Sequence, residues 1–260
     1  MSRVHKEVVR NIAWVRLDHP ANGNALSDGM VRELTEALSE ADRRDDVGAI
    51  ILSGSGENFC AGGDLNDFLA AKDQPLEKGY QNISPGMRLF ALGFQLRTPL
   101  VASVHGAARG GGVGLVALAH VVVADPAATF ALPEVSLGLF PFGIFPLLSR
   151  AMGPRRSLEL ALLSRTFTAE EARSYGLVHQ VSKHYLGDAE KLAQMLASRP
   201  SLAVTTGLEA YNHLTDQGSW PLDYLGLLRL LTLKSADLGR NVEKFLNRRP
   251  GEGSTTDNDT

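Results

Sequence analysis

The sequence lacks several features that define particular protein classes, and each absence excludes one of those classes. It has one cysteine, Cys60, among 260 residues, which excludes an internal disulfide and any metal site built from several cysteines. No apolar run reaches the roughly 18 residues that a membrane-spanning helix needs. The first ten residues carry charges where a signal peptide would have its apolar stretch. We therefore expect a cytoplasmic protein with no membrane partner.

The sequence also lacks an excess of one charge. Its formal net charge is −3, with 21% charged and 44% hydrophobic residues. Without a basic excess, there is no electrostatic case for nucleic acid as a main partner. The composition is ordinary for a globular protein, and the length suits one large domain or two small ones.

The first part of the chain alternates between apolar strands and amphipathic helices. Ser27 is placed to cap a helix whose apolar residues fall on one face. A second helix is expected near 88–96, before Pro99. The segments that we expect to be strands lie on either side of Asn11 and at 47–54, 100–104, 121–124 and 129–132. This alternation predicts α/β layers with a mostly parallel sheet.

Helical signals dominate after about residue 144. Thr168 and Glu171 form a capping-box pattern, and 176–181 gives the one strand signal. The expected helices include the apolar segments 201–214 and 222–246. The polar segment 72–84 is expected to be a mobile loop, and 251–260 a disordered tail.

Two glycine-rich loops each follow a buried strand and precede a helix. They are NFCAGGDL at 58–65 and HGAARGGGVG at 105–114. Free N–H groups at a helix N-terminus favour developing negative charge. Close helix–sheet packing would explain either loop alone, and the second loop lacks the dinucleotide-binding and P-loop registers. Together, at neighbouring strand ends, the loops would direct two N–H groups at one oxygen, as in an oxyanion hole.

From about residue 8 to residue 249, the chain resembles the enoyl-CoA hydratase/isomerase (crotonase) superfamily. The motifs that carry the resemblance are HPANGNALS at 19–27, ENFCAGGDL at 57–65, the block at 105–141 and TAEEARSYGLVHQV at 168–181. The resemblance implies an α/β, crotonase-like (ClpP/crotonase) spiral of ββα units over 1–195. It also implies a C-terminal helical trimerisation region over 196–250, and hence a homotrimer or a homohexamer made of two trimers.

The resemblance further implies a substrate, an acyl-CoA thioester, with no separate cofactor and no metal. Its oxyanion N–H groups would come from Gly63 and Gly111. The residues that would bind coenzyme A are Asn24, Ala25, Leu26, Ala61, Gly63, Asp64, Leu65 and, from a neighbouring subunit, Arg248.

The chain departs from the pattern of the family's hydratases at one position. Those enzymes carry two glutamates, and here the first position is Gly114 while the second is Glu134. Addition of water needs one group to orient water and another to handle the α-proton. Moving a double bond from C3 to C2 needs one base, which removes a proton from C2 and returns it at C4. The pattern resembles the family's Δ3,Δ2-enoyl-CoA isomerases, and its apolar neighbours should raise the pKa of Glu134.

Other interpretations of these residues stay open. Glu134 would otherwise cap a turn after Pro133, and the chemistry would otherwise be hydration, decarboxylation or thioester hydrolysis. A non-catalytic CoA-binding scaffold is a further alternative. Asp64 is expected mainly to brace a helix start, His105 to be structural and Cys60 to be a small packing residue.

The apolar segment GLFPFGIFPLL, residues 138–148, is expected to form a wall around an acyl chain or part of the core. Its bulky members Phe142, Phe145 and Pro146 suggest a reshaped acyl pocket, although core packing would require the same bulk.

Overall fold

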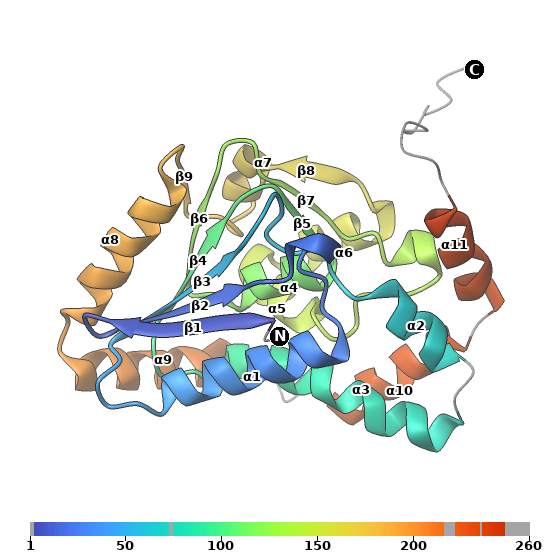
Figure 1. Cartoon of the computed structure of the whole chain (residues 1–260), viewed down its shortest axis with the longest axis horizontal. Coiled ribbons are helices and arrows are strands. Elements are labelled where there is room, and N and C mark those ends of the chain that lie inside the picture. The colour runs from blue at the N-terminus through green and yellow to red at the C-terminus, as the bar shows by residue number, and fades with distance from the viewer. Residues whose placement is uncertain (1–2, 73–74, 216–221, 235, 248–260) are drawn as a thin grey trace.

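The computed structural model describes residues 3–72, 75–215, 222–234 and 236–247. Within these ranges, six strands form the main sheet in the order β1-β2-β3-β4-β6-β9 (Figure 1). They are β1 (Val4–Val9), β2 (Ile12–Leu17), β3 (Ala49–Gly54), β4 (Leu100–Val104), β6 (Val121–Ala124) and β9 (Gln180–Val181). Only β1 and β2 pair antiparallel in this sheet. The prediction of a mostly parallel sheet is therefore confirmed.

A second sheet of three short strands lies beside the first. It has the order β5-β7-β8, formed by β5 (Ala107–Arg109), β7 (Thr129–Ala131) and β8 (Thr166–Thr168). The sequence predicts β7 but neither β5, whose residues belong to the glycine-rich segment 105–114, nor β8, which has one apolar residue between two threonines. β5 leads directly into the second glycine loop, so this sheet fixes where that loop lies.

Helices cover the main sheet on both faces (Figure 1). α1 (Asp28–Asp42) packs against β2 and is capped by Ser27, whose hydroxyl accepts a hydrogen bond from the Met30 N–H at 3.4 Å. α8 (Tyr185–Ala197) lies against β3, β4 and β6. Burial on both faces explains why β3 and β4 are continuous apolar runs.

The segment that the sequence predicts as a mobile loop is largely helical. α3 runs from Leu76 to Ala91, and a short 3-10 helix, η2 (Leu92–Phe94), continues it. Both the predicted loop at 72–84 and the predicted helix start near 88 are therefore wrong, apart from residues 73–74, which lie outside the described ranges. Pro85 lies inside this helix and lowers its intrinsic helix propensity. Packing against α1 and α10 overrides that propensity.

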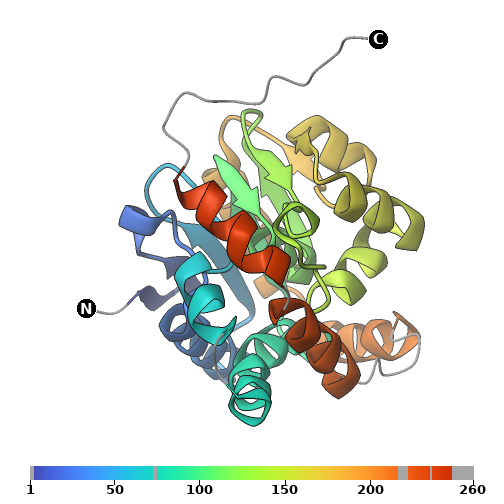
Figure 2. The same ribbon diagram turned by 90° about the vertical axis from the view of Figure 1, so that its right-hand side faces the viewer.

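The last two helices lie at one end of the molecule, the right-hand end of Figure 1 and the end that faces the viewer in Figure 2, whereas the helix before them lies at the lower left of Figure 1. α9 (Ser201–Thr215) confirms one prediction. The single helix expected over 222–246 is instead two helices, α10 (Leu222–Leu233) and α11 (Ala236–Leu246). α11 packs against α2 (Leu65–Lys72) and against the 3-10 helix η3 (Val135–Leu137), so the end of the chain closes over the loops between the strands. The tail predicted at 251–260 lies outside the described residues.

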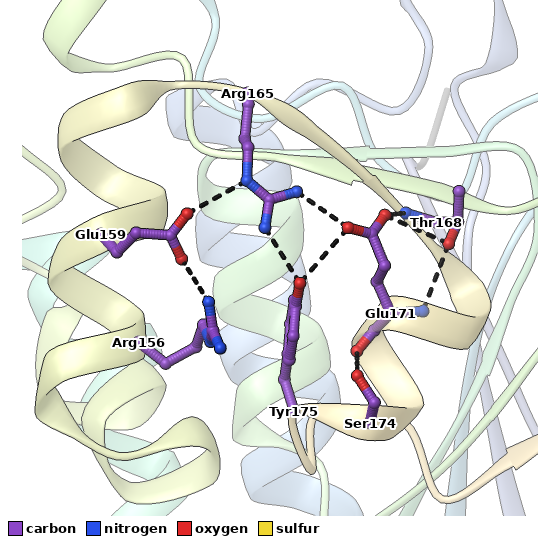
Figure 3. A network of polar contacts seen from close by, with 7 residues as sticks. All are labelled: Arg156, Glu159, Arg165, Thr168, Glu171, Ser174 and Tyr175. Atoms are coloured by element: carbon purple, nitrogen blue, oxygen red, sulfur yellow. Dashed lines mark hydrogen bonds and ion pairs between the residues drawn. The ribbon is translucent and has the colours of Figure 1, made fainter.

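A polar network fixes the β8–α7 corner to α6 (Figure 3). The capping box of Thr168 and Glu171 begins α7 (Ala169–Ser174), as the sequence predicts. Arg165 donates to Glu159, Glu171 and the Tyr175 hydroxyl at 2.9 to 3.1 Å. Because Glu159 belongs to α6 (Pro154–Leu163), the network ties the two helices together. None of the helices in the described part of the chain is both long and apolar enough to cross a membrane.

Candidate active site

A cavity of about 540 Å³ lies where the two glycine loops meet the C-terminal helices. Glycines and apolar side chains line most of it, together with a few polar side chains. The lining residues used below are Leu26, Ala61, Gly63, Leu65, Phe68, Phe90, Gly110, Gly111, Glu134, Phe142, Gly143, Ile144 and Arg229. A mostly apolar pocket with few convergent polar groups is typical of a small-molecule site.

The two amides that the sequence singles out lie on this cavity. The Gly63 nitrogen is 3.9 Å from the point that a Cβ on Gly111 would occupy. Since N and Cβ of one residue are about 2.5 Å apart, the two nitrogens are no more than about 6.4 Å apart. One oxygen spans that distance with two hydrogen bonds of up to about 3.2 Å.

Both amides are also available to a ligand. Within the described residues, neither the Gly63 N–H nor the Gly111 N–H donates a hydrogen bond to the protein. Gly111 is the first residue of α4 (Gly111–Leu118), where a helix has no internal acceptor for its N–H. The structure therefore brings together two unpaired donors from different loops.

The neighbouring glycines allow the close approach of the two loops and of Glu134. Gly110 has φ +48°, and a Cβ there would lie 2.7 Å from Glu134 Oε1. A Cβ on Gly112 would lie 2.4 Å from the Cys60 carbonyl oxygen in the other loop. Both positions exclude larger residues, so the glycine triplet serves packing as well as the free amide.

Glu134 lies just before η3, lines the cavity and is next to Gly110 of the second glycine loop. Its Oε2 is buried and has no hydrogen-bond partner among the described residues. Burial raises the pKa of Glu134 to about 7, an effect that the positive charge of Arg229 partly opposes. A carboxyl group with this pKa is suited to exchange protons near neutral pH.

Gly114 leaves no room for a second glutamate. A Cβ at Gly114 would lie 2.3 Å from Ile144 Cγ2 and 2.9 Å from Phe90 Cε1. Ile144 and Phe90 therefore fill the space that a side chain at this position would enter. Glu134 is the one carboxylate among the described residues that line the cavity.

The residues expected to bind coenzyme A separate into two groups. Leu26, Ala61, Gly63 and Leu65 line the cavity, whereas Asn24, Ala25 and Asp64 do not. Arg248 lies outside the described residues.

Asn24 positions the first glycine loop rather than facing the cavity. It is fully buried, and its Nδ2 donates to the carbonyls of Ser55 and Asn58 at 2.8 and 2.9 Å. Asp64 braces the start of α2, since its Oδ1 accepts from the Asn66 N–H at 2.9 Å. The expected helix-start role of Asp64 is confirmed.

Two other residues singled out by the sequence, His105 and Cys60, have structural roles. His105 Nε2 lies 2.9 Å from the Gly56 carbonyl oxygen, and its ring stacks on Tyr185. Cys60 is fully buried, and burial raises the pKa of its thiol to about 12. A protonated thiol is a poor nucleophile, so Cys60 is a packing residue, as expected. The described residues contain no group of three or more His, Cys, Asp or Glu side chains placed to hold a metal ion.

The apolar segment forms one wall of the cavity. Phe142 and Ile144 line it, whereas Phe145 begins α5 (Phe145–Met152) and packs against Phe140 with the ring centroids 5.2 Å apart. Of the three bulky residues singled out, Phe142 thus faces the pocket, and neither Phe145 nor Pro146 lines it.

Arg229 of α10 lines the cavity but is not among the site residues that the sequence predicts. Burial lowers the pKa of Arg229, while the charges of Glu134 and Asp28 oppose that shift. The available signal is one arginine inside the apolar run LGLLRLLTL. Nothing in that run indicates that α10 passes over the pocket.

Comparison with known proteins identifies the family. The family model for enoyl-CoA hydratase/isomerase matches residues 7–221. The chain belongs to the enoyl-CoA hydratase/isomerase family. It is 32% identical to the 1,2-epoxyphenylacetyl-CoA isomerase of Escherichia coli over 96% of this chain and 97% of that protein. It is 31% identical to the peroxisomal Delta(3,5)-Delta(2,4)-dienoyl-CoA isomerase of Arabidopsis thaliana, over 95% of this chain and 94% of that one.

Solved structures agree on the fold. An enoyl-CoA hydratase/isomerase from Mycobacterium paratuberculosis superposes with a TM-score of 0.87 over 94% of this chain and 98% of that one, at 23% identity. The crotonase fold expected from the sequence is therefore confirmed. Relatives of this enoyl-CoA hydratase/isomerase carry the names of both hydratases and isomerases, so family membership establishes an acyl-CoA enzyme without selecting the reaction.

Proposed function

We propose that this enzyme is an enoyl-CoA isomerase that moves a double bond from C3 to C2 of an acyl-CoA thioester. The observation that carries the proposal is a single carboxylate, Glu134, in a cavity that also presents two unpaired amides. Glu134 supplies one proton-transfer group, and one such group is enough for isomerisation.

In this reaction the thioester carbonyl oxygen accepts hydrogen bonds from the N–H groups of Gly63 and Gly111. Glu134, as the carboxylate, removes a proton from C2, and the electron pair spreads over a dienolate whose charge collects on the carbonyl oxygen. The two amides stabilise that charge, and one such donor is typically worth about 3 kcal/mol in the transition state. Protonated Glu134 then returns the proton at C4, leaving the double bond at C2. No atom is gained or lost.

The surroundings of Gly114 favour isomerisation over hydration. Hydration requires a second group to orient water, and Ile144 and Phe90 occupy the place where that side chain would stand.

A turnover assay tests the proposal. Purified enzyme is incubated with 3-enoyl-CoA and with 2-enoyl-CoA thioesters, and the products are identified by mass and ultraviolet absorbance. We expect conversion of 3-enoyl to 2-enoyl thioester without a change in mass, and a loss of at least about 100-fold in Glu134→Gln. The matched control is Glu209→Gln, which changes an exposed glutamate on α9. A hydrated product 18 Da heavier, or full isomerase activity in Glu134→Gln, would contradict the assignment.

We also propose that the enzyme is a cytoplasmic homotrimer or a homohexamer of two trimers, as the family resemblance implies. Sedimentation of the purified protein tests the assembly. A mass of three or six chains of 28.0 kDa supports it, whereas a stable monomer or dimer contradicts it.

A further inference from the structure

Arg229 presents a cation to the cavity that none of the described residues pairs. Its guanidinium makes no hydrogen bond or ion pair with any described residue. The nearest stabilising group is the ring of Phe68, whose centroid lies 5.4 Å from Arg229 Cζ. A guanidinium carries five donors, and withdrawing it from water without acceptors is unfavourable. An anion in the cavity would provide those acceptors.

Neither nearby carboxylate takes that role. Glu134 and Arg229 act on each other through their charges, but Glu134 forms no ion pair or hydrogen bond with the guanidinium. Asp28 acts on Arg229 through its charge, but it neither lines the cavity nor bonds to the guanidinium. The guanidinium donors of Arg229 are therefore left at the pocket wall without a bonded acceptor among the described residues.

The position of Arg229 along the cavity indicates which part of a substrate would reach it. Phe90 Cζ lies 3.6 Å from the Cβ position of Gly111, and Phe90 Cδ2 lies 3.8 Å from the Cβ position of Gly143. Arg229 Nη1 is 3.7 Å from that same Gly143 position. The oxyanion amide, the Phe90 ring, Gly143 and the guanidinium thus follow one another along one wall. A thioester carbonyl held at Gly111 would place its acyl chain against Phe90, with the far end of the chain approaching Arg229.

We propose that Arg229 selects acyl-CoA substrates whose acyl chain ends in a carboxylate, that is, thioesters of unsaturated dicarboxylic acids. The inference rests on the proposed function, because it places the thioester at Gly63 and Gly111. A guanidinium matches a carboxylate with two parallel hydrogen bonds, which gives direction as well as affinity. The remaining pocket wall is mostly apolar and suits the methylene groups in between.

Equilibrium binding tests the inference without turnover. Saturated CoA thioesters of four- to eight-carbon dicarboxylic acids are compared by calorimetry with their ω-methyl esters, which have the same chain without the charge. The wild-type protein should bind the acid at least about tenfold more tightly than the ester at one or more lengths, which is about 1.4 kcal/mol. Arg229→Met should abolish this preference, and Arg229→Lys should keep part of it. The matched control, Arg32→Met, changes an exposed arginine on α1 and should retain the wild-type ratio.

Equal or tighter binding of the esters at every length would overturn the inference, and so would an unchanged preference in Arg229→Met. Whether the acid binds more tightly than the ester is measured on the wild-type protein alone, so this outcome does not depend on the folding of a variant. A preserved acid preference in a protein that isomerises no 3-enoyl thioester would refute the proposed function and leave the role of Arg229 standing. Isomerisation of uncharged 3-enoyl chains by a protein with no preference for the acid would support the proposed function and refute the role of Arg229.

Discussion

Glu134→Gln should make the stability of the protein less dependent on pH. The carboxyl lies in an apolar cavity, and burial raises its pKa from 4.5 to about 7. The folded state therefore binds this proton more tightly than the unfolded chain does. The resulting stability is fully present below pH 4.5 and is lost as the pH rises through about 7. Glutamine does not titrate and keeps the same shape.

The size of the effect follows from the two pKa values. The reference is low pH, where Glu134 is protonated in both the folded and the unfolded state. Relative to it, this carboxyl lowers the free energy of unfolding of the wild-type protein by about 1 kcal/mol at pH 5 and by about 3 kcal/mol at pH 8. The stability of Glu134→Gln relative to wild type should therefore rise by about 2 to 3 kcal/mol between pH 5 and pH 8. Any constant effect of the amide, such as an unpaired N–H, cancels in this difference.

Urea unfolding at the two pH values measures this quantity, at one fixed protein concentration because an oligomer would make stability concentration-dependent. The control is Glu209→Gln, which removes an exposed carboxylate from α9 and should show no comparable pH-dependent gain. If the relative stability of Glu134→Gln is the same at pH 5 and pH 8, the carboxyl is not desolvated in the folded state and the reasoning fails.

Three further outcomes follow from the packing of the loops. Gly114→Glu should lower the free energy of unfolding by more than about 1 kcal/mol, because its side chain would overlap Ile144; an unchanged melting temperature would show that the space is open. Asn24→Ala should cost about 1 to 3 kcal/mol through the lost bonds to two loop carbonyls, and thermal unfolding at the wild-type temperature would refute this. Cys60 should not react with a thiol reagent at pH 8 until urea unfolds the protein, since burial raises the pKa of the thiol to about 12; rapid labelling of the native protein would contradict its burial.

The sequence predicts the main sheet well because its strands carry strong signals. β3 and β4 are buried on both faces and therefore appear as unbroken apolar runs. α3 is missed for the opposite reason, since its first half is polar and Pro85 interrupts it. That helix depends on contacts with α1 and α10, which lie far away in the sequence. β8 is missed because it has one apolar residue, Phe167, between two exposed threonines.

In the candidate site, too, some features follow from local sequence patterns and others depend on contacts between distant segments. The free amides follow from glycine loops that end strands and begin helices, a pattern visible in the sequence. The raised pKa of Glu134 follows from apolar neighbours that are close in sequence, such as Leu132 and Leu137. Arg229 lies at the cavity because α10 packs against α2 and α3, which are far away in the sequence. Such a position depends on tertiary packing, and no local pattern in the sequence encodes it.

The pH dependence of isomerisation tests the central claim most directly, because kcat/KM reports the pKa of the essential base in the free enzyme. With a 3-enoyl-CoA substrate, kcat/KM should rise tenfold per pH unit below the pKa of Glu134 and level off above about 7. The residual rate of Glu134→Gln should lack this bend. A wild-type profile that is flat from pH 5.5 to 8.5 would contradict proton transfer by Glu134.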